Sequence, residues 1–353
     1  MPKKPKPSGL IGFQNTIRIH SQSGAGAATA AMVKLAVRSQ KRGPFFRFSE
    51  ILNPPLPCQE DLAGVHAGCP DLIVDFKGDW AKFLHECGLA DYGISQSKVD
   101  VRKDTIRYLT ARARTPDARP RMVHESRELS IPPKHASDYE ALKKRFTTGA
   151  DLRPYLSRDI VTKRKPYNND TLLGAWGIHH LHFKKKGTEH VLFCRITDTD
   201  VFVLQALSHK DENVWVNEEF IEIMHNNWAK EIVDEKVNLL VPEKLSRERR
   251  KSLRNENANF ITTVKDGTIY LAPGGGIMTS GHSANVMMIC RGIFIELEKF
   301  ERDVMASSEE FRSTLNWEPE KTLRVTMMFD HQDYCIYEPS TMTRIRLNYP
   351  SSQ

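Results

Sequence analysis

Residues 173–215 read LGAWGIHHLHFKKKGTEHVLFCRITDTDVFVLQALSHKDENVW, and this stretch decides the fold that we expect. It contains three short runs rich in β-branched, aromatic and other apolar residues, at 177–183, 190–196 and 201–207. Lysine and glycine separate the first two runs, and the sequence TDTD separates the second from the third, as is typical of tight turns. Short strands joined by tight turns predict an antiparallel meander.

Helical patterns flank this meander on both sides. Before it, residues 137–155 predict a helix, with Ser137 as a plausible N-cap and Glu140 at the capping-box position. After it, apolar residues at helical spacing predict a second helix over 217–233. Farther along, residues 282–304 predict a long helix followed by three strands.

The whole chain predicts an α+β protein made of four segments. Residues 1–24 are rich in Pro, Lys, Ser and Gly, which indicates a disordered basic tail. Residues 25–134 predict a helical N-terminal region that ends in a polar linker over 115–134. Residues 135–233 hold the central antiparallel sheet with its preceding helix, and residues 234–353 predict a C-terminal α/β domain.

The composition of the chain limits which binding partners and which cellular compartment we expect. The chain has 353 residues, a formal net charge of +7 and a pI of about 9.0, which is compatible with RNA or another anionic partner. No apolar run approaches the roughly 20 residues of a membrane-spanning helix, so no membrane partner is expected. The six cysteines form no CxxC pair, which indicates reduced thiols and a cytoplasmic location.

The central stretch resembles the core of the RelE/HigB/ParE toxin family. In that family a strand ending in basic residues turns into a strand that carries an arginine. A Val-rich strand follows and ends in a basic pair, then an acidic residue and an aromatic. Here these features are Arg195, the strand over 201–207, the pair His209 and Lys210, and then Asp211 and Trp215. The rest of the chain is not covered by the resemblance.

The resemblance implies an RNA-cleaving toxin or defence effector, namely a metal-independent endoribonuclease in which the 2′-hydroxyl attacks the neighbouring phosphate. That reaction needs a base, an acid for the leaving 5′-oxygen, and cations for the phosphorane charge. Histidine suits the first two roles near neutral pH, and arginine and lysine suit the third. We therefore expect His180 or His182, with His209, to transfer protons, and Arg195 and Lys210 to bind the phosphate.

RNA is the expected partner, beside an antitoxin or a regulatory protein, and no cofactor is expected. The predicted RNA contacts are Trp215, Lys184, Lys185, Lys186, Arg249 and Arg250. An alternative is a non-catalytic RNA- or protein-binding module that keeps the sheet. Trp215 favours this alternative, because family members usually carry a tyrosine there and an indole cannot exchange protons as a phenol does.

Two zinc sites and one phosphate site are weaker alternatives. His180, His182 and His209 could bind zinc, and so could a second loose set made of Cys58, His66, Cys69, His85 and Cys87. Neither spacing fits a zinc module, so no metal is predicted. A glycine-rich turn over 273–276 could cradle a phosphate, but it lacks the P-loop and dinucleotide patterns, which favours a structural turn.

Overall fold

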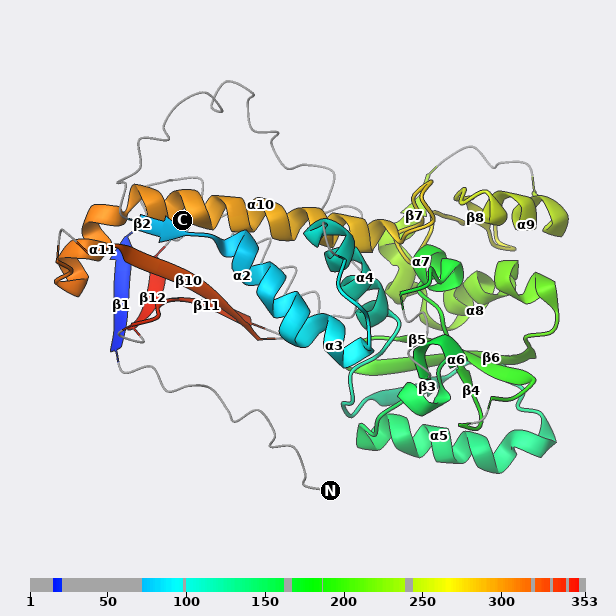
Figure 1. Ribbon diagram of the computed structural model, residues 1–353. Coiled ribbons are helices and arrows are strands. Elements are labelled where there is room, and N and C mark those ends of the chain that lie inside the picture. Colours follow the sequence, from blue (N-terminus) through cyan, green and yellow to red (C-terminus); the bar gives the residue numbers. More distant parts are fainter. Residues whose placement is uncertain are drawn as a thin grey trace. The chain divides into compact units, whose positions relative to one another are not determined.

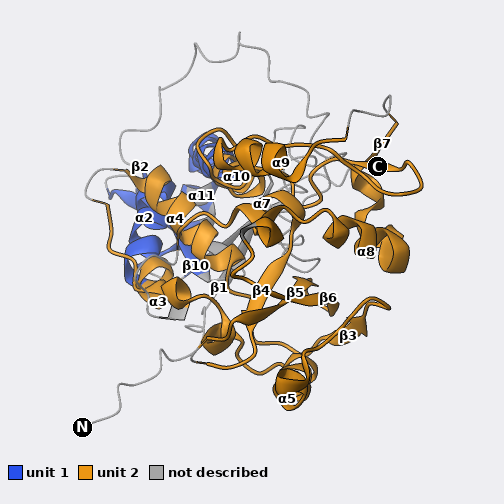
Figure 2. Cartoon of the chain, turned by 90° about the vertical axis from the view of Figure 1, so that its right-hand side faces the viewer, with its two compact units in different colours: residues 1–37, 57–86, 292–353 blue, residues 38–56, 87–291 orange. Residues whose placement is uncertain are grey.

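The computed structural model describes residues 15–20, 72–97, 100–161, 167–185, 187–238, 244–318, 321–330, 333–340 and 343–348. Over these residues the chain mixes helices and sheets, so the predicted α+β class is confirmed (Figure 1). The chain forms two compact units (Figure 2). The described residues before 87 and after 291 belong to the first unit, and residues 87–291 belong to the second.

The second unit is built on a four-stranded sheet. Its strands are β3 (Met122–Glu125), β4 (His179–His182), β5 (His190–Ile196) and β6 (Asp200–Ser208), in the order β3-β6-β5-β4. Strands β4, β5 and β6 are antiparallel neighbours, which confirms the predicted meander. Strand β3 adds to the edge of the meander in parallel with β6.

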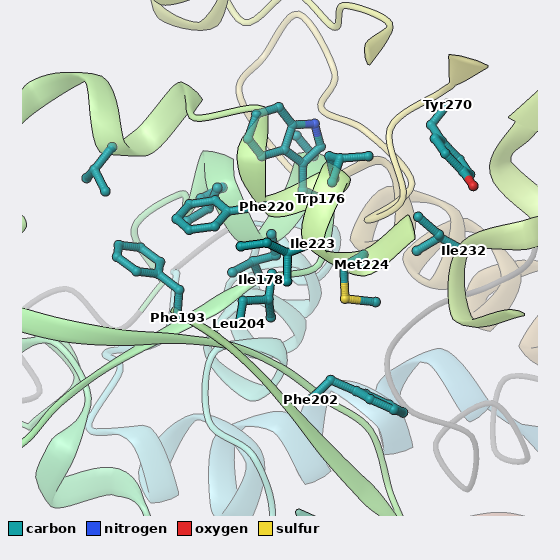
Figure 3. Packing of buried hydrophobic residues seen from close by; sticks show 14 of the residues in the cluster. Trp176, Ile178, Phe193, Phe202, Leu204, Phe220, Ile223, Met224, Ile232 and Tyr270 are labelled. Carbon is teal, nitrogen blue, oxygen red and sulfur yellow. The ribbon is translucent and has the colours of Figure 1, made fainter. Parts of the chain in front are cut away.

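Side-chain alternation gives the sheet two packed faces. One face packs against α7 (Thr171–Trp176) and α8 (Glu219–Trp228), and Figure 3 shows Phe193 and Leu204 of the sheet beside Phe220 and Met224 of α8. The other face packs against α5 (Ala136–Thr148), where Leu142 and Phe146 meet Leu181, Leu192 and Val203. The central strands are therefore covered on both sides, which explains their nearly continuous apolar sequence.

Helix α5 begins earlier than its sequence suggests. Its N-cap is His135, and Ser137 lies inside the first turn, so the predicted capping box is wrong. The short 3-10 helix η4 (Pro133–His135) leads directly into α5 and starts it before Ser137 is reached. At the other end Gly149, with φ of 72°, stops the helix in the left-handed conformation that glycine adopts without strain.

The domain boundary that we expected within 115–134 is absent. This segment contains β3, which pairs with β6 from Met122–Asp200 to Glu125–Val203 and so belongs to the central sheet. The expected C-terminal domain over 234–353 is also divided, because residues 234–291 belong to the second unit. The change between units falls within α10 (Ala284–Ala306), at Gly292.

Smaller elements complete the second unit. A three-stranded sheet has the order β7-β9-β8. Its strands are β7 (Lys236–Val237), β8 (Thr262–Thr263) and β9 (Ile269–Tyr270). The remaining helices are α3 (Leu89–Tyr92), α4 (Val101–Ala113), α6 (Arg158–Val161), α9 (Arg247–Asn255), and the 3-10 helices η5 (Arg153–Tyr155), η6 (Glu212–Val216) and η7 (Ala229–Glu235).

The first unit holds a five-stranded sheet in the order β1-β12-β11-β10-β2. Its strands are β1 (Asn15–His20), β2 (Leu72–Val74), β10 (Leu323–Asp330), β11 (Asp333–Glu338) and β12 (Thr343–Asn348). The long helix and the three C-terminal strands that the sequence predicts are thus confirmed. Helices α2 (Phe76–Phe83) and α11 (Ser308–Leu315) and the π-helix η3 (Leu84–Gly88), which crosses the unit boundary, complete the list.

The first unit has an aromatic core where α2 meets the sheet. The Trp80 ring lies 5.1 Å from that of Phe329 on β10, and the two rings meet edge to face. The predicted disorder of the basic tail over 1–24 is wrong at residues 15–20, which form β1 and pair in parallel with β12; the other residues of the tail lie outside the described ones. In the part of the chain that is described, none of the helices combines the length and hydropathy needed to cross a membrane.

Candidate functional site

The three predicted proton-transfer histidines come together at one end of the central sheet. His180 and His182 both project from β4 on the face of their cross-strand partners Phe193 and Val191, as alternation predicts. The His209 ring, just after β6, lies 5.5 Å from the His182 ring. The Trp215 ring lies 5.0 Å from the His180 ring, edge to face. We call His180, His182, His209 and Trp215 the histidine cluster.

A carboxylate stands beside the first of these histidines. Nδ1 of His180 lies 3.8 Å from Oδ2 of Asp170, which is an electrostatic contact that is too long for a hydrogen bond. Burial lowers the pKa of His180 below its ordinary value, and the Asp170 carboxylate opposes this shift. His180 is therefore neutral at pH 7, so it can accept a proton, and Asp170 stabilises the imidazolium that results.

His182 is held by the backbone of the β4–β5 turn. Its Nδ1 lies 2.9 Å from the Thr188 nitrogen and 3.1 Å from the Thr188 carbonyl oxygen. One neutral tautomer accepts from that N–H, whereas the other tautomer and the imidazolium donate to the carbonyl. Burial lowers the pKa of His182, and the Thr188 backbone opposes the shift. The turn thus supports both protonation states, and Nε2 is left for a substrate.

Local sequence explains how Asp170 reaches this position. Its Oδ1 accepts from the Leu173 nitrogen, so Asp170 is the N-cap of α7, and Oδ2 remains for His180. Helix α7 ends at Gly177, with φ of 71°, and the chain turns directly into β4. Our sequence interpretation missed Asp170. An Asp immediately before an apolar helical run is an N-cap signal that could have found it.

Arg195 does not join the histidine cluster, contrary to our expectation. It is on the predicted face of β5, but it pairs with Phe202 at the end of β5 away from His190 and His182, and it is only 6% exposed. Burial lowers its pKa, and the carboxylates of Glu235 and Glu231 oppose that shift. Its guanidinium therefore lies in the interior of the protein near these carboxylates, where it cannot contact an RNA phosphate.

Other cations lie nearer to the cluster. The positive charges that depress the pKa values of His180 and His182 include those of Arg114 and Arg158, respectively, and Arg158 is exposed at the start of α6. Lys210, next to His209, has a side chain that is 71% exposed and lies 3.4 Å from Glu189. Surface ion pairs of this kind are weak because water screens them, so Lys210 can exchange its partner for a phosphate.

The predicted RNA-contacting residues divide into exposed and buried ones. Lys184 and Lys185 are exposed in the turn after β4, and Lys184 lies 3.6 Å from Asp138. Lys186 lies outside the described residues. Arg249 is exposed on α9, so the structure leaves these described basic side chains accessible to an anion.

The prediction that Arg250 contacts RNA is wrong, because the residue is buried. It is 5% exposed, and its Nη1 lies 2.8 Å from Glu218 and 2.5 Å from the Leu245 carbonyl oxygen, to which it donates. Adjacent helix residues point in different directions, so Arg249 faces solvent while Arg250 anchors α9. The Arg250 guanidinium is a structural group that is not available to RNA.

The metal and phosphate alternatives gain no support from the described residues. No group of three or more His, Cys, Asp or Glu among them is arranged to hold a metal ion. Cys58, His66 and Cys69 of the second zinc set lie outside the described residues. In the glycine-rich turn, Gly274 donates to Ala175 and Gly276 donates to Gly174, so these N–H groups are already bonded and the turn is structural.

Comparison with known proteins adds no relative. No protein-family model matches the chain, and neither curated proteins nor solved structures give a match. The resemblance to the RelE/HigB/ParE family therefore stays a prediction.

Proposed function

We propose that the protein is a metal-independent endoribonuclease, acting as a cytoplasmic RNA-cleaving toxin or defence effector. The observation that carries the proposal is the convergence of His180, His182 and His209 beside Trp215 at a sheet end that carries exposed lysines. Imidazoles from two segments of the chain, β4 and the residue after β6, supply both an acid and a base within reach of one phosphodiester.

The proposed reaction has one chemical step. A neutral imidazole on β4, from His180 or His182, removes the proton of the ribose 2′-hydroxyl. The 2′-oxygen forms a bond to phosphorus while the bond from phosphorus to the 5′-oxygen breaks. The His209 imidazole gives a proton to that 5′-oxygen. The products are a 2′,3′-cyclic phosphate and a free 5′-hydroxyl, so no water or oxidant is consumed.

RNA would be held by stacking and by exposed charge. Trp215 is half-buried: it packs against His180 and Phe193 and keeps part of the indole accessible to a base. Lys184, Lys185 and Lys210 flank the histidines in the sequence and are exposed, so they suit the phosphates on either side of the cleaved bond. Arg158 takes the place that we first gave to Arg195. Restraint in the cell would fall to an antitoxin or a regulatory protein.

The test is cleavage of purified RNA in excess EDTA by the wild type and by matched histidine variants. His182→Gln and His209→Gln should each lower the cleavage rate by about 10²- to 10⁴-fold, which is the usual contribution of an acid or a base. His124→Gln is the control, since His124 lies on β3, away from β4 in the strand order, and pairs with Asp200 at 2.7 Å. Equal cleavage by all three variants would refute the assignment.

One observation favours the second candidate, a non-catalytic RNA-binding module. Arg195, the cation that the resemblance places at the phosphate, is buried near Glu235 and Glu231. A wild-type protein that binds RNA tightly but leaves it intact would support this module. Binding would then depend on Lys184 and Lys185, and it would be unchanged in His182→Gln.

A further inference from the structure

A cavity lies in the second unit, beside the histidine cluster but facing a different side chain of β4. It is lined by the end of α4, by α7, by β4 and by the start of α10. His179 lines it, whereas His180 projects to the other face, because adjacent strand residues alternate. Asp170 is shared with the histidine cluster, but His179 has no role in the proposed cleavage reaction.

The cavity has room for a small heterocycle. Its volume is about 120 Å³. A water-sized group needs roughly 10–15 Å³ measured in this way, so the space takes about eight to twelve such groups. Apolar side chains from opposite walls supply most of the surface, among them Leu109, Leu173, Val286 and Ile289. A flat ligand with apolar faces and about ten heavy atoms fits this size and lining.

Two buried side-chain atoms of the wall, Nδ1 of His179 and Oγ1 of Thr110, have no hydrogen-bond partner among the described residues. His179 is 4% exposed, and its Nε2 lies 3.3 Å from the Ala113 carbonyl oxygen, while Nδ1 has no partner. Burial lowers the pKa of His179 to about 4, so the ring is neutral at pH 7. Since Nε2–H donates to Ala113, Nδ1 is an acceptor whose hydrogen-bonding capacity is not used by the described residues.

The second such group is the Thr110 hydroxyl. Thr110 is 7% exposed and lines the cavity from α4, and its Oγ1 has no partner. The hydroxyls of Thr105 and Thr115 instead donate to carbonyl oxygens four residues earlier, at 2.7 and 2.9 Å. Thr110 therefore lacks the hydrogen bond to a helix carbonyl oxygen that Thr105 and Thr115 make. A buried hydroxyl without a hydrogen-bond partner lowers the stability of the fold.

The charges of the lining argue against a phosphate or another strongly charged ligand. Three arginines and three aspartates line the cavity: Arg112, Arg114, Arg121, Asp117, Asp170 and Asp198. Arg121 is already bonded to backbone carbonyl oxygens, including that of Thr197 at 2.6 Å. Balanced charge with an acceptor and a hydroxyl at the edge suits a neutral ring that carries both donors and acceptors.

We infer that this cavity binds a purine base, with a ring N–H or amino group donating to Nδ1 of His179 and a ring acceptor taking the Thr110 hydroxyl. A purine base has apolar faces and polar edges, and adenine contains ten heavy atoms. These properties match the size, lining and charge of the cavity. A pyrimidine is smaller and leaves part of the space unfilled. The inference stands apart from the proposed ribonuclease activity, because it uses other residues and needs no cleavage.

The test is calorimetric titration of the full chain with adenosine and with guanosine, with uridine as the comparison ligand. We expect one of the purine nucleosides to bind at least tenfold more tightly than uridine. Thr110→Val keeps the side-chain shape and should weaken binding by about 2- to 10-fold, the range for one net hydrogen bond. His179→Leu should weaken it similarly, while His179→Gln, which keeps an acceptor, should retain most of it. Ile289→Trp should abolish binding by filling the cavity.

Each outcome decides the inference. No purine binding at millimolar concentration in the folded wild type, or equal binding of uridine, would overturn it. Binding that is unchanged in Thr110→Val and Ile289→Trp, with unchanged circular dichroism, would overturn the site. Competition by an adenine oligonucleotide identifies an RNA base as the occupant, and its failure to compete identifies a free nucleoside. Because no cleavage is measured, the proposed ribonuclease can fail while this inference stands.

Discussion

The pH dependence of stability in the second unit gives a sharp test of how His179 is buried. Its ordinary pKa is 6.5, and burial lowers this to about 4 in the folded state. Between these two pH values His179 is protonated in the unfolded chain but stays neutral in the folded chain. The burial of neutral His179 therefore has no pH-dependent effect on stability above pH 6.5, and it destabilises the folded state progressively as the pH falls toward 4.

The magnitude follows from the pKa difference. At 1.36 kcal/mol for each pH unit, a difference of about 2.5 gives a loss of about 3 kcal/mol in the free energy of unfolding. The side chain is 4% exposed, so solvent screening does not reduce this value much. His179→Gln cannot titrate, but it can still donate to the Ala113 carbonyl oxygen.

Urea unfolding followed by tryptophan fluorescence at pH 7 and at pH 4 measures the effect. Carboxylates titrate in both proteins, so the difference between wild type and His179→Gln isolates the histidine. The wild type should lose about 3 kcal/mol more than the variant over this interval. Parallel losses in the two proteins would refute the claim that His179 is buried in its neutral form.

Four other perturbations test separate parts of the structure. Asp170→Asn should lower the pKa of His180 further in an NMR titration of its imidazole, while stability changes by less than about 0.5 kcal/mol because Asn also caps helices. Gly274→Ala should cost about 1–3 kcal/mol by thermal unfolding, since its Cβ would lie 2.4 Å from the backbone nitrogen at the C-cap of α7. Gly292→Ala on α10 meets open space and should instead stabilise by about 0.5–1 kcal/mol. Lys185→Ala should reduce the salt dependence of RNA binding by about one unit of slope in a fluorescence titration, and an unchanged slope would remove Lys185 from the interface.

The meander was predictable because its signals are local. Each strand is a short β-rich run with turn residues at both ends, and alternation alone placed His180 and His182 on one face. Strand β3 was missed because its four residues, Met122–Glu125, lie in a polar stretch and pair in parallel with β6, far along the chain. The sequence around a short strand does not indicate which distant strand it pairs with.

The candidate site was predictable only in part for the same reason. Alternation assigned Arg195 to the correct face, but it gives no sign that the side chain is buried near Glu231 and Glu235 of η7. Arg250 was read as a surface cation because the charged run around it gives no sign that Glu218 lies opposite. The cavity at His179 is formed by four elements distant in sequence, so only the folded chain brings its walls together.

The most direct test of the proposed function is the end-group chemistry of RNA incubated with the wild-type protein in excess EDTA. We predict fragments with 2′,3′-cyclic phosphate and 5′-hydroxyl ends, which His209→Gln should fail to produce. Fragments with 5′-phosphate ends, or RNA that remains intact while bound to the folded protein, would contradict the proposal that the histidine cluster cleaves RNA through its own 2′-hydroxyl.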